Sequence, residues 1–473
     1  MKVLKPAINL YSHQKLSLNL MNTHNRYGLY LEMGLGKTLI GLSDIVRKIH
    51  INGARKILVV ATKSIIAAWQ RDMQMLTDQA RALVEKYVTF TNYEQLVDRK
   101  YNVDGKKVVK RTENGSVILD TKWDYIIFDE CQKLKDHNSS THKNSLKIAY
   151  RAKYVYLLTG SPVVNGQLIN YHAYDLFLNP TLYRGRIVSA HWGGVTKFKN
   201  DFGILDQWYN IKVYTNVDKI LNYVKTVSVR MYSKDYLDLP DMLEPEIWEV
   251  EMTKEQEKIY KEMAKSSTIE SEEIIAENPA SRLNYLRQIA SGFYYRHIEN
   301  DGETGREAIS LSLEKAKLLQ TYLSETDDPL VIFYNYDQEL KDIVHVLKKL
   351  KVKHLILNGS TKPKDKGNWR IFQEDDSVRV YVAQISAGAR GIDLYKSSKV
   401  LYYSLPLSSE VFEQSKKRIN RIGTKNPSSY FIFASKGSIE YAIYQALQNY
   451  LDFNKVMFSK YITTYEKGMK IKK

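Results

Sequence analysis

The sequence predicts an α/β protein with two parallel β-sheets in two domains. Two sets of short runs are apolar throughout, as expected of parallel strands that are covered on both faces. Stretches between the runs are long enough for crossover helices. About 170 residues separate the two sets, so we expect two sheets rather than one. The runs are KILVVA at 56–61, DYIIFDE at 124–130 and YVYLLTG at 154–160, then LVIFYN at 330–335, HLILNG at 354–359, VRVYVAQ at 378–384, KVLYYS at 399–404 and YFIFAS at 430–435.

The stretch between the two sets has a different composition. It contains charged, helix-favouring segments such as TKEQEKIYKEMAKSS at 253–267 and a proline-containing segment, LPDMLEP, at 239–245. We interpret residues 165–310 as helical protrusions and a linker, with a hinge near 233–245. The expected domains are 1–235 and 236–473, and the second carries a helical protrusion at about 250–310.

Composition limits the class of protein. One cysteine, Cys131, excludes an internal disulfide and a cysteine-based zinc site. No apolar run approaches the ~18 residues of a membrane span, and the N-terminus lacks a signal-peptide pattern, so we expect a cytoplasmic protein. Lys plus Arg number 70 against 53 Asp plus Glu, a net charge of 70 − 53 = +17. This surplus favours a polyanionic partner, although a lysine-rich genome would give the same bias.

The stretch YLEMGLGKT at 30–38 is a candidate phosphate-binding turn. The full pattern requires G-x-x-x-x-G-K-[ST], and Leu31 stands where the first glycine belongs. Gly34 and Gly36 allow backbone N–H groups to approach phosphates, and a following helix adds a favourable dipole. Lys37 can reach the β- and γ-phosphates of ATP, and the Thr38 hydroxyl is placed for Mg²⁺. The alternative is a glycine turn with a surface lysine.

Two adjacent acids follow the predicted strand DYIIF. Asp129 and Glu130 lie at its carboxyl end, and ligands of parallel sheets bind at that edge. Asp129 is therefore expected to hold Mg²⁺, and Glu130 to orient and deprotonate an attacking water. An acidic loop that caps a helix is the alternative, and the nearby glycine-lysine turn counts against it.

The motifs resemble those of superfamily-two helicases and translocases, across nearly the whole chain. DECQ at 129–132 resembles their DExx box, and YLEMGLGKT resembles the ADEMGLGKT form of the Swi/Snf branch. The resemblance implies two RecA-like domains with helical insertions, and it places Gln14 of YSHQKLSLNLM on the adenine base. Further similar segments are VVATKSIIAAWQRDM, which ends near Trp69, TNYEQL at 91–96 and LTGSPVVN at 158–165.

The second half resembles the family's second motor domain. AQISAGARGIDLYKSSKVLYYS is similar to a nucleotide-contacting strand and loop, which includes Gly391. QSKKRINRIGTKN at 414–426 places Arg418 and Arg421 where the family has arginine fingers. Two cations three residues apart share one face of a helix, so we expect both to point the same way. A solvated basic helix is the alternative reading. The chain departs from the family pattern at Leu31, Met242, Asp393, Ser415, Lys417 and Thr424.

The resemblance also implies DNA as partner. LPDMLEPEIWEVEMTKEQEKIYKEM and LRQIASGFYY resemble segments of the Swi/Snf branch, which favours tracking along duplex DNA with little sequence specificity. The residues expected at the DNA backbone are Lys63, Asn92, Ser360, Thr361 and Ser386.

We therefore expect a DNA-dependent ATPase, a compact bacterial or phage translocase of replication, recombination or repair. Replication or recombination proteins are possible partners. Two alternatives stay open. One is a strand-separating or annealing helicase: the sequence encodes no recognisable separation pin, but an insertion at 181–230 could hide one. The other is a non-hydrolysing DNA-binding scaffold, against which Glu130 and the two arginines count.

Overall fold

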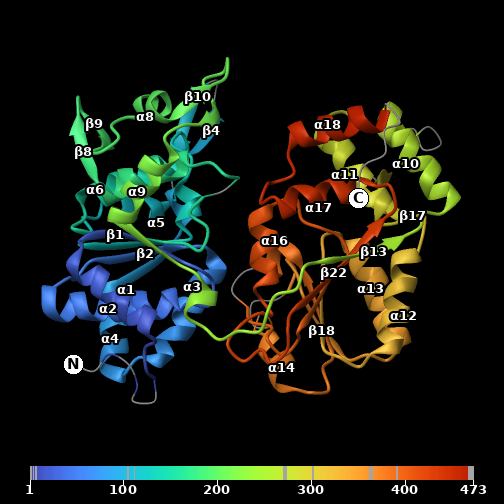
Figure 1. Ribbon diagram of the computed structural model, residues 1–473, viewed down its shortest axis with the longest axis horizontal. Coiled ribbons are helices and arrows are strands. Elements are labelled where there is room, and N and C mark those ends of the chain that lie inside the picture. Colours follow the sequence, from blue (N-terminus) through green and yellow to red (C-terminus); the bar gives the residue numbers. More distant parts are fainter. Residues whose placement is uncertain are drawn as a thin grey trace. The chain divides into compact units, whose positions relative to one another are not determined.

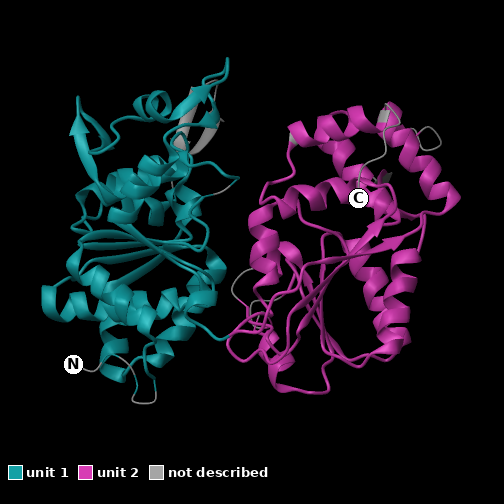
Figure 2. Ribbon diagram, in the orientation of Figure 1, with its two compact units in different colours: residues 1–238 teal, residues 239–473 magenta. Residues whose placement is uncertain are grey.

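The computed structural model describes residues 3–466, apart from 4, 6, 7, 104, 105, 111, 164, 270–273, 301, 302, 362–364, 366, 390 and 391. The chain forms two compact units, Met1–Asp238 (unit 1) and Leu239–Lys473 (unit 2), which Figure 2 shows in different colours. The predicted division after residue 235 and this division both lie in the segment that joins the last strand of unit 1 to the first strand of unit 2. Helices that could cross a membrane, long and apolar enough to do so, are absent from the described residues.

Unit 1 is built on a parallel sheet that has six strands in the described part of the chain, in the order β12-β1-β7-β6-β2-β3. Three predicted runs form the neighbouring strands β7, β6 and β2, as their uniform burial requires. The edge strands β3 and β12 mix polar with apolar residues and were not predicted, and neither was β1. The strands are β1 Arg26–Leu31, β2 Ile57–Ala61, β3 Val88–Asn92, β6 Tyr125–Asp129, β7 Tyr154–Leu158 and β12 Ser228–Met231.

Helices cover both faces of this sheet (Figure 1). Apolar residues of α1–α4 pack on one face, and those of α5, α6, α7 and α9 pack on the other. The helices of unit 1 are α1 Ser12–Thr23, α2 Lys37–Asn52, α3 Lys63–Asp72, η1 Met73–Met75, α4 Asp78–Tyr87, η2 Tyr93–Leu96, α5 Glu113–Asp120, η3 Cys131–Leu134, α6 Ser140–Arg151, α7 Ile169–Leu178, α8 Val195–Phe202, α9 Val217–Val227 and η4 Ser233–Asp235.

Unit 2 repeats the arrangement, and its parallel sheet has the order β13-β22-β21-β18-β20-β19 among the residues that the structure describes. All five predicted runs of the second set are strands of this sheet, so the predicted pair of parallel α/β sheets is confirmed. The strands are β13 Glu246–Val250, β18 Leu330–Tyr334, β19 His354–Leu357, β20 Val380–Gln384, β21 Lys399–Tyr402 and β22 Ser429–Ser435.

The helices of unit 2 also form two layers. Apolar residues of α12 and α13 pack on one face of the sheet, and those of α10, α11, α14 and α16–α18 belong to the core on the other face. These helices are α10 Lys254–Ser266, α11 Pro279–Ala290, α12 Glu314–Glu325, α13 Asp337–Lys349, α14 Trp369–Glu374, α15 Ile385–Gly388, α16 Ser409–Lys416, α17 Ile439–Gln448 and α18 Lys455–Glu466.

The stretch 165–310 is not purely helical, which corrects our interpretation of it. It contains antiparallel hairpins as well as helices, and it also supplies the edge strands β12 and β13 of the two sheets. Short strands bounded by glycine and polar residues give a weak period-2 signal, so the sequence did not reveal them. The two-stranded hairpins of the chain are β4 Arg99–Val103 with β5 Lys106–Lys110, β8 Pro180–Tyr183 with β9 Arg186–Ser189, β10 Gly203–Leu205 with β11 Ile211–Tyr214, β14 Thr268–Ile269 with β15 Ile274–Ile275, and β16 Phe293–Asn300 with β17 Glu303–Ser310.

Candidate active site

The predicted phosphate-binding turn joins β1 to α2 at the carboxyl edge of the first sheet. Gly34 has φ +86° and Gly36 has φ +73°, a backbone region that favours glycine. A Cβ on Gly34 would have no heavy atom within 4 Å, so this side of the turn is open to a ligand. A Cβ on Gly36 would lie 2.3 Å from Nε2 of Gln14, so glycine is required there for space as well.

Lys37 is the first residue of α2 and turns back over the end of β1. Its Nζ donates to the carbonyl oxygen of Leu31 at 2.8 Å and to that of Glu32 at 3.4 Å. Thr38 follows and is half-buried. The 16 residues of α2 aim their first backbone N–H groups at this turn, which suits an anion.

Gln14 lies on α1 beside the turn. Its Nε2 donates to the carbonyl of Leu35 at 3.4 Å, and its Oε1 accepts from the backbone N–H of Tyr11 at 3.0 Å. His13 also contacts Leu35, with its ring Nε2 at 3.1 Å from the same carbonyl, and burial lowers the pKa of His13. Our sequence analysis missed His13, although it precedes Gln14 directly in YSHQ.

Glu32 ties the turn to the end of unit 1. Its Oε2 accepts from the backbone N–H of Ser233 at 2.7 Å and from the Ser233 hydroxyl at 2.5 Å. Ser233 begins the segment that leaves β12 toward unit 2. The contact fixes the exit of the chain at the edge that carries Lys37, and it has no counterpart in our predictions.

Asp129 is the last residue of β6, and its side chain is buried. Its carboxylate accepts from the Trp69 indole N–H at 2.8 Å and from the backbone N–H of Glu130 at 2.9 Å. The Tyr93 hydroxyl donates to its backbone carbonyl at 2.8 Å. Burial and the charge of Glu130 raise the pKa of Asp129 to about 6, and the Lys37 ammonium opposes this shift. Lys37, Asp129 and Glu130 therefore form one electrostatic cluster.

Glu130 is held in a left-handed backbone conformation, with φ +55°. Its Oε2 accepts from Nε2 of Gln132 at 2.6 Å, and Oε1 of Gln132 accepts from the Thr159 hydroxyl at 2.7 Å. Thr159 follows β7, the strand between β1 and β6. A non-glycine residue at positive φ stores strain and is enriched at functional sites. Four residues therefore position the acidic pair, and in the sequence only their motifs could have suggested them. They are Gln132 in DECQ, Thr159 in LTGSP, Trp69 in AAWQ and Tyr93 in TNYE.

The two DNA candidates of unit 1 lie at the same sheet edge, beyond the acidic pair. Lys63 is exposed at the first turn of α3, after β2, and Asn92 ends β3, the edge strand. The side-chain oxygen of Asn92 is buried and has no hydrogen-bond partner within the described protein. The structure thus places them one and two strands away from Asp129 along the sheet.

Arg418 and Arg421 do not lie on a helix, which corrects our expectation of a shared helical face. The helix α16 ends at Lys416, and the next residues form turns. The hydroxyl of Thr424 accepts from the backbone N–H of Arg421 at 3.0 Å, and its own N–H donates to the Arg421 carbonyl at 2.9 Å. Gly423, at φ +107°, completes a conformation that a helix cannot continue.

The two arginines also differ in surroundings. Arg418 is buried, and its Nη1 donates to the Ile392 carbonyl at 3.0 Å. Arg421 is half-buried, and its Nε lies 3.4 Å from the Asp393 carboxylate. Both side chains therefore hold the loop after Gly391, and Arg421 is the more accessible of the two.

The remaining candidates of unit 2 follow strands of its sheet. Ser360 and Thr361 come after β19, in a turn closed by Asn358, whose Oδ1 accepts from both hydroxyls at 2.9 and 3.1 Å. Ser386 is exposed on α15, directly after β20. Gly391 lies outside the described residues.

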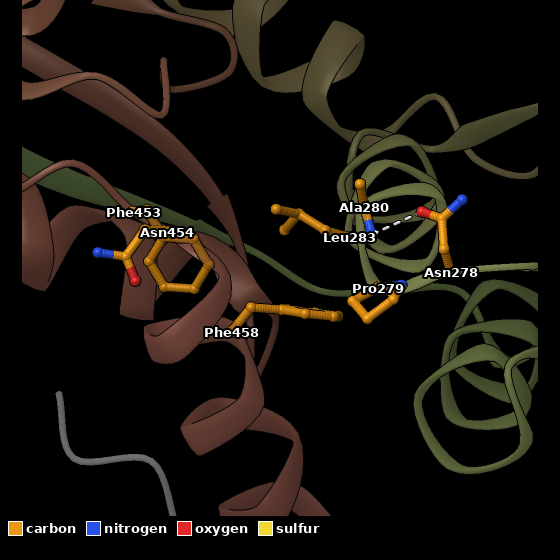
Figure 3. Close-up of a pocket in the computed structure, with 7 residues that line it drawn as sticks. All are labelled: Asn278, Pro279, Ala280, Leu283, Phe453, Asn454 and Phe458. Atoms are coloured by element: carbon orange, nitrogen blue, oxygen red, sulfur yellow. Dashed lines mark hydrogen bonds between the residues drawn. The ribbon is translucent and has the colours of Figure 1, made fainter. Parts of the chain in front are cut away.

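An apolar pocket in unit 2 is a separate feature (Figure 3). It has a volume of about 250 Å³ and lies between the start of α11 and the start of α18. Its lining is Asn278, Pro279, Ala280, Leu283, Phe453, Asn454 and Phe458. These side chains carry no charge and do not suit a triphosphate, so the pocket does not compete with the glycine turn as nucleotide site.

The donor set at the first sheet fits Mg²⁺ bound together with a nucleotide. A cluster of three or more His, Cys, Asp or Glu able to hold a metal by itself is absent from the described residues. Mg²⁺ is usually bound by one or two protein oxygens plus phosphates and waters rather than by an all-protein cage. Asp129 and Thr38 offer such oxygens. The carboxylate of Glu130 also lies close enough to contribute, after burial, to the raised pKa of Asp129, and two neighbouring carboxylates favour a bound cation.

The glycine turn, Lys37 and the acidic pair Asp129 and Glu130 lie at one edge of a parallel sheet, as the helicase-like motifs of the sequence predict. Comparison with protein families agrees. Residues 13–292 match the SNF2-related domain, and residues 314–423 match the helicase conserved C-terminal domain. The chain belongs to the SNF2-related family.

Relatives are distant in sequence. An uncharacterized ATP-dependent helicase of Mycoplasma pneumoniae is 24% identical over 89% of this chain and 39% of its own length. The transcription regulatory protein SNF2 of Saccharomyces cerevisiae is 22% identical over 92% of this chain and 27% of its own length. The chain thus spans about two fifths or less of these relatives. The SWI2/SNF2 ATPase core of Sulfolobus solfataricus, solved with double-stranded DNA, is similar at 20% identity and a TM-score of 0.42, covering 99% of this chain and 96% of that one.

Proposed function

We propose that this chain is an ATP-driven motor that tracks along duplex DNA and hydrolyses ATP as it moves. The observation that carries the proposal is the cluster of Lys37, Asp129 and Glu130 at one sheet edge, with both acids held in place. Trp69 fixes the first carboxylate and Gln132 the second. A structural acidic loop would not need two buried side-chain donors and a strained backbone.

The residues of unit 1 have distinct roles in this proposal. Lys37 and the N–H groups from Gly34 to Thr38 bind the β- and γ-phosphates, and Gln14 contacts the base. Asp129 and Thr38 hold Mg²⁺, which when bound neutralises charge on the phosphates. Glu130 orients the attacking water and takes its proton.

Unit 2 supplies positive charge to the transition state. Arg421 is the stronger candidate because its side chain is partly exposed, although it must leave both Asp393 and the Lys417 carbonyl, to which its Nε donates at 3.1 Å. Arg418 is buried and bonded to the backbone carbonyl of Ile392, so it contributes by holding the loop at Ile392. Charge supplied in the transition state raises kcat rather than affinity for ATP.

DNA contacts are proposed at both sheets. Lys63 and Asn92 in unit 1, and Ser360, Thr361 and Ser386 in unit 2, all follow strands at carboxyl ends and bind the phosphate backbone. The net charge of +17 supports a polyanionic partner. We place the motor in replication, recombination or repair of bacterial or phage DNA, with proteins of those processes as partners.

Steady-state ATP hydrolysis tests the proposal. Turnover is measured without nucleic acid and with closed circular duplex, single strands, forked DNA and RNA. Duplex DNA is expected to raise turnover at least about tenfold, and RNA to have little effect. A chain that binds DNA but shows the same slow turnover as Glu130→Gln on all substrates would instead be the non-hydrolysing scaffold.

A further inference from the structure

The hairpin β10–β11 presents two large aromatic side chains to solvent. Trp208 is 76% exposed and Tyr209 is 59% exposed, and both lie in the turn between the strands. Ile204 and Val213, which are partners on the two strands, are also exposed. The other tryptophan of this region, Trp192, is instead buried in the core. Apolar side chains that cluster on an exposed surface often mark a binding site.

The turn is rigid although its aromatic rings are exposed. The Asp206 carboxylate accepts from the backbone N–H groups of Trp208 at 2.8 Å and of Asn210 at 2.9 Å. Asp206 also donates its own N–H to the Asn210 carbonyl at 2.8 Å. Nζ of Lys199, on α8, donates to the Tyr209 carbonyl at 2.7 Å. These contacts fix the backbone of the turn, so a ligand that binds the two rings does not pay the entropic cost of ordering the turn.

The base of the hairpin is attached to the loop that positions Glu130. The Tyr214 hydroxyl donates to Oε1 of Gln167 and accepts from the N–H of Ile169, both at 3.1 Å. Those two residues follow the LTGSP segment, whose Thr159 contacts Gln132. At Gly203, a Cβ would lie 2.9 Å from the Lys199 carbonyl, so the hairpin packs closely on α8. The hairpin that carries the exposed turn is therefore anchored to α7 and α8 of unit 1.

We propose that Trp208 stacks on an unpaired DNA base, so that the motor engages DNA where a duplex opens. The inference rests on the proposed function, and it adds to tracking along duplex DNA a specific contact at junctions between duplex and single strand. Aromatic rings on a firm turn accept any base, because each base has a π-face. The hairpin β10–β11 lies within residues 181–230, the stretch in which a strand-separating helicase could carry its separation pin.

The size and charge of the turn favour a base over a protein surface. A protein partner normally covers about 800 Å² of each surface, and a turn with two exposed rings offers much less. Lys199 and Lys212 lie on the hairpin and its supporting helix. The hairpin β8–β9, which carries Arg184 and Arg186, lies at the same end of unit 1, with α8 between the two hairpins in the view of Figure 1. Cations beside an aromatic platform are the usual design of single-strand binding sites.

Three variants of Trp208 separate stacking from other contacts. Affinity is measured by fluorescence anisotropy for a labelled oligothymidylate, a labelled fork and a relaxed closed circular duplex as competitor. Trp208→Ala is expected to weaken the oligothymidylate and fork about 5- to 100-fold, the range for one lost stack. Trp208→Phe should stay within about threefold of wild type, and Trp208→Leu should resemble Trp208→Ala. The matched control is Ile51→Ala, which removes another exposed apolar side chain of unit 1 and should change nothing.

The outcomes distinguish this inference from the function on which it rests. If wild type gains ATP turnover with duplex DNA but Trp208→Ala binds the fork as well as wild type, stacking is wrong and the motor stands. If Trp208→Leu binds the labelled DNA with wild-type affinity, stacking is also wrong, because an aliphatic side chain makes an apolar contact but cannot stack on a base. If wild type binds no DNA and gains no turnover, the proposed function itself is wrong.

Discussion

At the scale of the residue, the acidic pair shows how neighbours decide chemistry. Asp129 and Glu130 are adjacent in sequence, yet one accepts from an indole and the other from an amide. These bonds leave the two carboxylates in different surroundings. The motifs located both acids, and the donors that hold them required the folded structure.

Glu130→Gln is expected to abolish turnover and to leave ATP binding intact. The amide cannot take a proton from water, whereas Lys37, Thr38 and Asp129 remain to bind the nucleotide. Hydrolysis should fall at least about 100-fold, the scale of general-base loss. A fluorescent ATP analogue measures binding, and Lys37→Ala, which removes the phosphate contact, is the control that should lose binding. Near-normal turnover in Glu130→Gln would mean that another group activates the water.

Asp44 gives a residue-scale prediction about pH. Burial raises its pKa to about 6 from the model-peptide value of 3.8, although the Lys48 ammonium and a hydrogen bond from the Tyr125 hydroxyl oppose the shift. Between these two pH values the folded chain holds a proton that the unfolded chain has released. Stability therefore falls as pH rises through this window, by about 3 kcal/mol in total.

Asp44→Asn removes this titration. Relative to wild type, the variant should gain about 2–3 kcal/mol between pH 4 and pH 7. Thermal unfolding at both pH values measures the difference, which should appear as a Tm gap that widens with pH. A gap that does not change with pH would show that the pKa of Asp44 is the same in the folded and the unfolded chain.

At the scale of the element, apolar runs predicted the inner strands apart from β1, because burial on both faces leaves no alternation to misread. The edge strands β3 and β12, and the hairpins, escaped prediction since their side chains are partly exposed. The prediction of a helix over Arg418 and Arg421 was wrong for another reason. Its charged residues favour helix, but Thr424 and Gly423 stabilise a turn that local propensity does not reveal.

Two helices of unit 2 are joined by a buried ion pair, which gives the element-scale prediction. Nζ of Lys315 on α12 lies 2.7 Å from the Glu440 carboxylate on α17, and both side chains are almost fully buried. Lys315→Met would leave Glu440 buried without its cation, at a cost of about 3–5 kcal/mol. Thermal unfolding should show a clearly lower Tm.

The double variant Lys315→Met with Glu440→Gln serves as the control. It leaves no buried charge at this position, so it should recover a large part of the lost Tm. If the double variant is less stable than Lys315→Met by as much as Glu440→Gln alone destabilises the wild-type chain, the two side chains do not act as a pair.

At the scale of the whole molecule, charge connects composition to function. A net charge of +17 over 473 residues predicts DNA binding that weakens steeply with salt, because phosphate contacts release counterions. With six or more such contacts, affinity should fall about 10³-fold or more between ~50 and ~200 mM salt. Anisotropy titrations with duplex DNA measure the slope. A flat response would assign the surplus charge to solubility rather than to a nucleic-acid partner.

The central claim is that two units, each with its own parallel sheet, act on one ATP. Arg421 and Asp129 are about 290 residues apart in sequence and belong to different units. Single-turnover hydrolysis with saturating DNA tests the claim in Arg421→Ala, with Arg418→Ala as comparison. Arg421→Ala should keep ATP affinity within a few-fold and lose roughly 10³-fold in rate, the scale of an arginine finger. Hydrolysis at the wild-type rate in both variants would contradict the claim, since unit 2 would then have no part in the chemistry.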